Sequence, residues 1–170
     1  MTEALNPEPL LRALHDAGVR HIIIGGFAVN AHGVIRPSKD LDIVPDPEPA
    51  NLERLAALLA ELDARHVGLG DMRPEEFPFD PTRSEDLRAA ANFRLETNLG
   101  DLDVMQWVAG IDTEPAYAAL ADGAIEGELD GIPLCVCGLE HLVAMKRAAG
   151  RPRDLDDLRL LGADPDNGSA

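Results

Sequence analysis

The chain has 170 residues, of which 45% are hydrophobic, so it is long enough to form one domain with its own core. Its formal net charge of -16 argues against broad, sequence-independent binding to nucleic acid, which depends on lysines and arginines that neutralise phosphates. No apolar run approaches the roughly 18 residues of a membrane helix. We therefore expect a cytoplasmic protein without membrane contact, with one domain over residues 1–162 and a disordered tail over 163–170.

The first third of the chain predicts two helices and two strands before a longer helix. Leucines at helical spacing indicate a helix over residues 8–17. The β-branched run of "HIIIGG" predicts a buried strand that ends at Gly25 and Gly26, and "FAVNAHG" is typical of a short helix closed by Gly33. Alternation in "KDLDIVP" then favours a second strand, and a wide apolar stripe predicts a helix over 51–63.

The remaining two thirds predict two hairpins and further helices. Residues 66–83 lack any period and are expected to form a loop. The alternating runs of "NFRLETNLGDLDVMQWV" predict a hairpin that turns at residues 98–100, and "GELDGIPLCV" predicts another at 130–131. A helix is expected over 113–121, and "GLEHLVAMKRAAG" and "DLDDLRLLG" predict two closing helices. The expected fold class is α/β to α+β, a small mixed sheet with helices packed on one face.

Three aspartates are the candidate metal ligands. On a strand, Asp40 and Asp42 project to one face with Cα atoms about 6.5 Å apart, and two carboxylates that close repel unless a cation neutralises them. Asp103 lies between two apolar residues of the first hairpin and is the third candidate, whereas Asp101 is nearer the turn and is expected to be solvated. Oxygen ligands without histidine or cysteine favour Mg²⁺ or Mn²⁺.

The glycine pair before the aspartates strengthens this interpretation. Gly25 and Gly26 stand between a strand and a helix, where backbone N–H groups can approach a phosphate. An Asp-x-Asp or a Gly-Gly alone carries little information, because aspartates at strand ends often only cap turns. In this order and spacing the two features together indicate phosphoryl transfer at a metal site.

The apolar strand, the Gly-Gly pair, the short helix, the Asp-x-Asp strand and a third Asp on a later strand resemble the DNA polymerase beta type nucleotidyltransferase superfamily. Within it, "GGFAVNAHGVIRPSKDLDIV" is similar to minimal nucleotidyltransferases and to abortive-infection (AbiEii-like) toxin nucleotidyltransferases. The Arg-x-Thr-x-Asp-x-Asp run of those toxins is matched by Arg36, Ser38, Asp40 and Asp42. Their later Lys and Arg-Asp-x-x-Asp motifs are matched by Lys146 and by "RDLDD" from residue 153.

The resemblance implies a nucleotidyltransferase fold and transfer of a nucleoside monophosphate from an NTP, with Asp40, Asp42 and Asp103 as Mg²⁺ ligands. Asp103 would also help to deprotonate the acceptor. Gly25 and Gly26 would seat the triphosphate. Ser38 and Asp154 are added as candidate nucleotide-binding residues, and Lys146, Arg36 and Lys39 would balance phosphate charge. Two departures from the family pattern are Gly26, often serine there, and Ser38, commonly threonine.

Several of these positions have an ordinary structural alternative. A helical Lys146 is more often a solvated charge, and Asp154 is favoured here as the N-terminal cap of the last helix, with the site role second. Trp107 and Phe93 are expected to pack in the core. Phe77 and Phe79 stand in a polar loop, where anchoring of the loop is the first interpretation and contact with an acceptor or partner is the second.

The leading functional hypothesis is an Mg²⁺-dependent nucleotidyltransferase that acts on a hydroxyl of a tRNA 3′ end, a protein or a small molecule. A toxin role with a cognate antitoxin as partner is a biological setting for the same chemistry. The alternative is a catalytically silent module that keeps the fold and binds a nucleotide or a partner protein.

Overall fold

The structure is a computed structural model that describes residues 3–68, 71–90 and 92–164. Of the tail predicted over 163–170, residues 165–170 lie outside the described residues, as do residues 69–70 of the loop predicted over 66–83. None of the described helices has the length and the apolar character needed to cross a bilayer.

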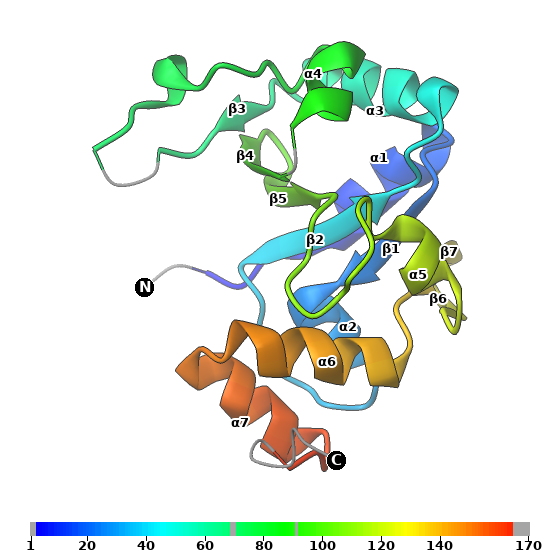
Figure 1. Cartoon of the computed structure of the whole chain (residues 1–170). Helices are drawn as coiled ribbons and strands as arrows, with labels where there is room; N and C mark the ends of the chain where they lie inside the picture. Colours follow the sequence, from blue (N-terminus) through cyan, green and yellow to red (C-terminus); the bar gives the residue numbers. More distant parts are fainter. Residues whose placement is uncertain (1–2, 69–70, 91, 165–170) are drawn as a thin grey trace.

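The described residues form helices and strands in alternation along much of the chain (Figure 1). The helices are α1 (Glu8–Asp16), α2 (Gly25–Ala31), α3 (Pro49–Glu61), α4 (Ser84–Ala89), α5 (Tyr117–Ala121), α6 (Leu139–Ala149) and α7 (Pro152–Leu160), with a 3-10 turn at Pro74–Glu76. The strands are β1 (His21–Ile24), β2 (Asp40–Pro45), β3 (Arg65–His66), β4 (Asn92–Thr97), β5 (Gly100–Met105), β6 (Ile125–Leu129) and β7 (Ile132–Val136).

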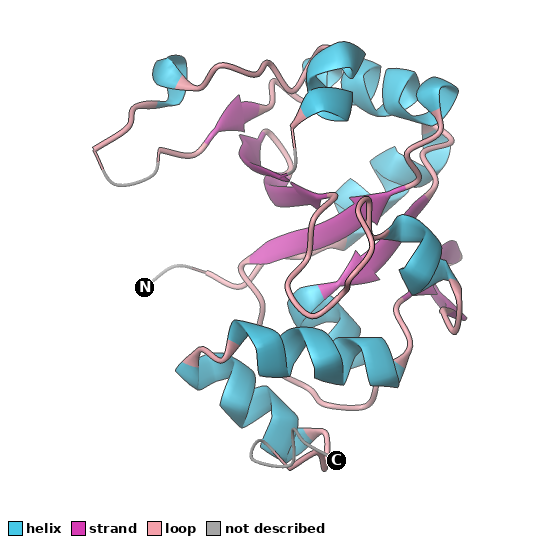
Figure 2. Ribbon diagram, viewed as in Figure 1, coloured by secondary structure: helices cyan, strands magenta, loops and turns pink. Residues whose placement is uncertain are grey.

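The strands form one mixed sheet in the order β3-β4-β5-β2-β1-β7-β6. β2 pairs antiparallel with β1 and parallel with β5, and β7 pairs parallel with β1. Figure 2 shows the strands between two groups of helices, with α3 and α4 at the top of the view and α6 and α7 at the bottom. The predicted fold class, a small mixed sheet with helices, is confirmed, but the helices lie on both sides of the strands and not on one face as expected.

The central strands divide their side chains between a core face and a polar face. Leu41 and Ile43 of β2 and Leu102 and Val104 of β5 are buried in one cluster, which also contains leucines of α1 and α3. On the alternate positions, Asp40, Asp42 and Asp103 are partly buried and Asp101 is exposed. Because successive side chains of a strand point to opposite faces, the core packing of the leucines directs the aspartates to the other face.

The strand and hairpin predictions agree closely with the structure, and the main differences are in helices. The first hairpin turns at residues 98–99, and Gly100 pairs with Thr97 as the first residue of β5. The sequence did not predict α4, and the helix expected over 113–121 is confined to Tyr117–Ala121. The segment expected to be a loop over 66–83 holds the 3-10 turn at Pro74–Glu76.

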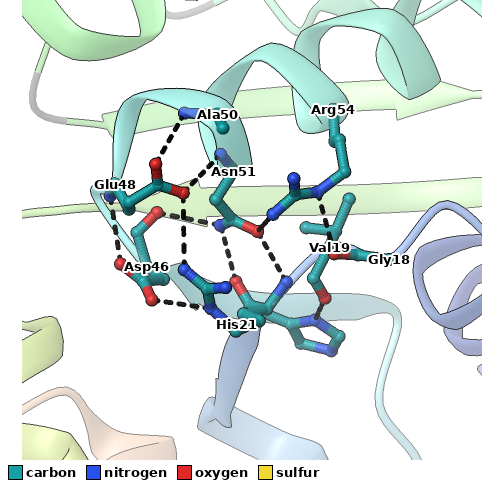
Figure 3. Close-up of polar contacts among 9 residues, drawn as sticks. Gly18, Val19, His21, Asp46, Glu48, Ala50, Asn51 and Arg54 are labelled. Carbon is teal, nitrogen blue, oxygen red and sulfur yellow. Dashed lines mark hydrogen bonds and ion pairs between the residues drawn. The ribbon is translucent and has the colours of Figure 1, made fainter.

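A buried asparagine ties α3 to the ends of β1 and β2 (Figure 3). Asn51 is fully buried, and its Oδ1 accepts a hydrogen bond of 2.7 Å from the backbone N–H of Arg20. Its Nδ2 donates to the carbonyl oxygens of Arg20 at 2.9 Å and Asp46 at 2.8 Å. Glu48 caps α3 by accepting hydrogen bonds from the N–H groups of Ala50 and Asn51. These contacts hold β1 and β2 together at the end of the pair that is remote from Asp42.

Candidate active site

Three carboxylates converge on the polar face of the sheet. The parallel register of β2 and β5 places Asp42 opposite Asp103, and Asp40 opposite Asp101. One carboxylate oxygen from each of Asp40, Asp42 and Asp103 lies within 4.8 Å of the others. The convergence therefore follows from strand pairing: adjacent strands supply one Asp-x-Asp pair and one further aspartate.

The proximity of these groups perturbs their ionisation. Burial, followed by the charges of Asp40 and Asp103, raises the pKa of Asp42 to about 7, although Lys146 acts in the opposite direction. Burial and the charge of Asp40 also raise the pKa of Asp103 to about 6, while Arg94 opposes the shift. The positive charges of the protein are therefore insufficient to hold the pKa values of Asp42 and Asp103 at their ordinary level.

The donor set fits a hard divalent cation. It consists only of carboxylate oxygens, the ligands that Mg²⁺ and Mn²⁺ prefer, and its members are close enough to share an ion. A bound cation would also compensate the repulsion that raises the pKa values of Asp42 and Asp103. The residues present thus fit the metal predicted from the sequence.

The two glycines are required by close approaches within the site. Gly25 has a φ of 67°, and a Cβ atom at this position would overlap Oδ2 of Asp42. A Cβ on Gly26 would lie 2.5 Å from the hydroxyl oxygen of Ser38 and 3.2 Å from Nη2 of Arg36. Ser38 is itself buried and donates a hydrogen bond of 3.1 Å to the carbonyl oxygen of Asp40. The glycines therefore leave room for the carboxylate and for the segment before β2.

Lys146 lies in a buried ion-pair network between α6 and α7. Its Nζ is 3.0 Å from Oδ1 of Asp154 and 2.8 Å from Oδ2 of Asp157, and both carboxylates are 1% exposed. Burial favours protonation of Asp154, but hydrogen bonds from Arg151 and Lys146 outweigh it and lower the pKa of this group. The expectation that Lys146 is a solvated charge is wrong, because these two aspartates offset the cost of burying an ammonium group.

The same network extends to the segment that precedes β2. Arg36 faces Asp157 through two nitrogens, with Nε 2.7 Å from Oδ1 and Nη2 2.9 Å from Oδ2. Arg153 donates from Nη2 to the carbonyl oxygen of Pro37 at 2.7 Å. Asp154 accepts from the backbone N–H and from Nε of Arg151, so it helps to cap α7 as predicted, but as the third residue of the helix, with Arg151 at the N-cap position. α7 is therefore joined by charge to the loop that leads into the Asp-x-Asp strand.

Most of these groups border one cavity of about 680 Å³, whereas Asp157 lies outside its lining. Its glycine side is lined by Gly25, Gly26 and Ser38, together with the basic residues Arg36, Lys146, Arg151 and Arg153. Its opposite side is formed by residues of β4 and β5 and by aromatic side chains: His66, Phe77, Phe93, Arg94, Met105 and Trp107. The three carboxylates lie in the lining between these two sides, since β2 and β5 are the central strands.

Neither a protein-family profile nor a curated protein matches this sequence. Solved structures do match. The lincosamide antibiotic adenylyltransferase LnuA, bound to lincomycin, superposes with a TM-score of 0.61 at 13% identity, over 94% of this chain and 98% of the other. ANT(2″)-Ia in complex with adenylyl-2″-tobramycin gives a TM-score of 0.56 at 18% identity, over 91% of this chain and 84% of the other.

The chain has a nucleotidyltransferase fold. This confirms the nucleotidyltransferase fold that the sequence motifs indicated. The likeness to the toxin nucleotidyltransferases in particular stays a prediction, as does the role of each site residue.

The nucleotidyltransferase fold brings together most of the residues that the sequence singled out. Asp40, Asp42 and Asp103 line the cavity with Gly25 and Gly26, and so do Arg36, Ser38, Lys146 and Asp154. Lys39 does not: it is exposed and lies outside the lining. Its contact with the nucleotide stays a prediction.

Sequence reasoning missed several residues of this candidate site, among them Trp107 and Arg94. Trp107 was expected in the core, but it is 50% exposed and lines the cavity, because the chain leaves the sheet after Met105. Arg94 was not singled out, although hairpin register predicts its place: it pairs directly with Asp103 across β4 and β5. Its Nε lies 3.6 Å from Oδ2 of that aspartate. Phe93, in contrast, is buried as predicted.

Proposed function

We propose that this protein is an Mg²⁺-dependent nucleotidyltransferase that moves a nucleoside monophosphate from an NTP to an acceptor hydroxyl. The observation that carries the proposal is the convergence of Asp40, Asp42 and Asp103 within 4.8 Å beside the Gly25–Gly26 turn, in a cavity bordered by basic side chains. The nucleotidyltransferase fold and the all-oxygen donor set support the same chemistry.

The protein residues supply position and charge. Gly25 and Gly26 line the β1 side of the cavity, where the triphosphate sits and Arg151 and Lys146 balance its negative charge. Asp40, Asp42 and Asp103 hold the cation, which when bound neutralises charge on the phosphoryl oxygens. Asp103 also accepts the proton of the acceptor hydroxyl. The acceptor oxygen then forms a bond to the α-phosphorus while the bond to the β-phosphate oxygen breaks, and pyrophosphate leaves.

A small-molecule acceptor has the most support among the three acceptor classes. Two of the structural neighbours were solved with lincomycin and with adenylyl-2″-tobramycin. The net charge of -16 disfavours extended contact with RNA. A toxin role with a cognate antitoxin rests on the sequence resemblance alone and adds no chemistry to this mechanism.

Labelled NTPs test the proposal directly. The protein is incubated with each labelled NTP, Mg²⁺ and a cell extract, and label is sought in the RNA, protein and small-molecule fractions. We expect one fraction to become labelled, and we expect the double variant Asp40→Asn, Asp42→Asn to abolish the transfer. Asp101→Asn is the matched control, because Asp101 stands opposite Asp40 on β5 but is exposed and lies outside the cavity lining.

Two outcomes would contradict the proposal. Transfer that persists in the double variant would show that these carboxylates do not hold the metal used in catalysis. NTP binding in the wild type, measured by calorimetry, without label in any fraction would instead favour the catalytically silent module.

A further inference from the structure

The position of the acceptor follows from the order of the strands, given the proposed function. Attacking and leaving oxygens lie on opposite sides of the phosphorus in a phosphoryl displacement. The glycines and the cations that suit pyrophosphate stand on the β1 and α6 side of the three carboxylates. The acceptor must therefore approach from the other side, where β5, β4 and β3 continue the sheet.

This side of the cavity has aromatic walls and one cation, and we call it the β4 compartment. It is lined by His66, Phe77, Arg94, Met105 and Trp107. The ring of His66 stacks on Phe77 with a centroid distance of 4.5 Å and an interplanar angle of 10°. His66 also contacts the carbonyl oxygen of Phe79 at 2.6 Å, so the ring anchors the segment that carries Phe77. Trp107 is half-exposed and is free to pack against a ligand.

The carboxylates of the cavity are already committed to other partners. The described lining contains four: Asp40, Asp42 and Asp103, which form the candidate metal site, and Asp154, which is bonded to Lys146 and Arg151. The next acidic pair on the same face of the hairpin, Glu96 and Asp101, lies toward the turn and outside the lining. The described lining thus has no further carboxylate for an ammonium group of the acceptor.

Arg94 is the cation of this compartment. It extends from β4 on the same face as Asp103, it is 55% exposed, and its contact with Asp103 is long at 3.6 Å. The other lining cations stand on the glycine side, where Arg36 and Lys146 are ion-paired with buried aspartates. A guanidinium is always charged and binds carboxylates and phosphates through paired N–H groups.

From this placement we infer that the acceptor is a hydroxyl compound with an aromatic or apolar ring and a negatively charged group. The aromatic walls bind the ring, and Arg94 binds the negatively charged group. Polycationic acceptors are excluded by the same arrangement. The inference names the substrate class of the proposed site, and Arg94 is its specificity-determining residue.

A charge series of small phenols tests the inference. The probes are para-hydroxyphenylacetate, its neutral amide and tyramine, which share a ring and a hydroxyl and differ in charge. Trp107 is the only tryptophan of the chain, so its fluorescence reports occupancy of the β4 compartment without any turnover. Each probe is titrated into the full chain with Mg²⁺ present, with free tryptophan amide as the optical blank. We expect the anion to bind about tenfold or more tightly than tyramine, because it gains a charge-assisted bond to Arg94.

Variants separate the role of Arg94 from general electrostatics. Arg94→Gln removes the charge from an exposed strand position, so the fold should persist. In this variant, the affinities for the anion and the amide should be within about twofold of each other. Arg65→Gln is the matched control, since Arg65 lies exposed on the adjacent strand β3 outside the lining. It should leave the order of affinities unchanged.

The results distinguish this inference from the proposed function. Tyramine binding as tightly as the anion, or an unchanged preference in Arg94→Gln, would overturn the inference while leaving nucleotide transfer intact. The absence of any tryptophan response to all three probes would also overturn it. NTP binding is measured separately by calorimetry: its failure, together with the expected order of phenols, would reject the transferase and keep the acceptor compartment.

Discussion

Gly25→Ala should damage the site more than it damages the fold. Alanine at this position would keep a φ of 67°, which costs roughly 1–2 kcal/mol for an L-residue. Its Cβ atom would also overlap Oδ2 of Asp42. Relief of that overlap by movement of neighbouring atoms costs about 1–3 kcal/mol more. A catalytic group displaced by about 1 Å lowers activity roughly 100-fold. We therefore expect a free energy of unfolding lower by roughly 2–5 kcal/mol and a loss of transfer activity of about two orders of magnitude.

Gly131→Ala supplies the comparison for Gly25→Ala. Gly131 has a φ of 78° in the turn between β6 and β7, and a Cβ there would meet nothing within 4 Å. In this variant only the positive φ should lower the free energy of unfolding, by roughly 1–2 kcal/mol, which corresponds to a fall in Tm of roughly 2–8 °C. Its activity should be unchanged. Thermal denaturation and the labelled-NTP assay measure both variants. Equal losses of stability and activity in the two would refute the argument that Gly25 protects the position of Asp42.

Three further predictions concern ionisation and buried polar groups. The pKa of Asp42 is raised from 3.8 to about 7 in the metal-free fold, so folding favours the protonated form of this group. Its contribution to stability therefore falls as the pH rises from about 4 to 7. In thermal scans without metal, Asp42→Asn should lose less stability over this pH range than the wild type. Lys146→Met removes the ammonium partner of the buried Asp154 and Asp157, which keep Arg151 and Arg36, so urea denaturation should show a loss of about 3 kcal/mol, the lower end of the range for a broken buried ion pair. Asn51→Ala removes four hydrogen bonds of a fully buried side chain, for which we expect a loss of about 1–3 kcal/mol in the same assay. A loss near zero would contradict the tie between α3 and the strand ends.

Strands were predictable here because their side chains alternate and their turns carry glycine. The Asp-x-Asp strand and the hairpin at residues 98–100 needed only this local pattern, and the pairing of Arg94 with Asp103 could have been counted along the same hairpin. The convergence of Asp42 with Asp103 was beyond local pattern, because it depends on the parallel pairing of two strands distant in sequence. The motif resemblance supplied that link.

Residues whose environment is set by distant elements were the ones misjudged. Lys146 is typical of a solvated helix position by its neighbours, and only the packing of α7 against α6 brings Asp154 and Asp157 to its ammonium group. Tryptophan is a residue type that usually packs in a core, yet Trp107 follows the end of β5 and lines the cavity. α4 was missed because its six residues are too few to show a helical period.

The parallel pairing of β2 with β5 also has a consequence for folding kinetics. The pairing joins segments that are separated in the sequence by α3 and by strand β4. Such non-local contacts require closure of a long loop, which is expected to slow folding. A divalent cation that binds the carboxylate cluster only in the folded sheet would shift the folding equilibrium toward the native state by mass action.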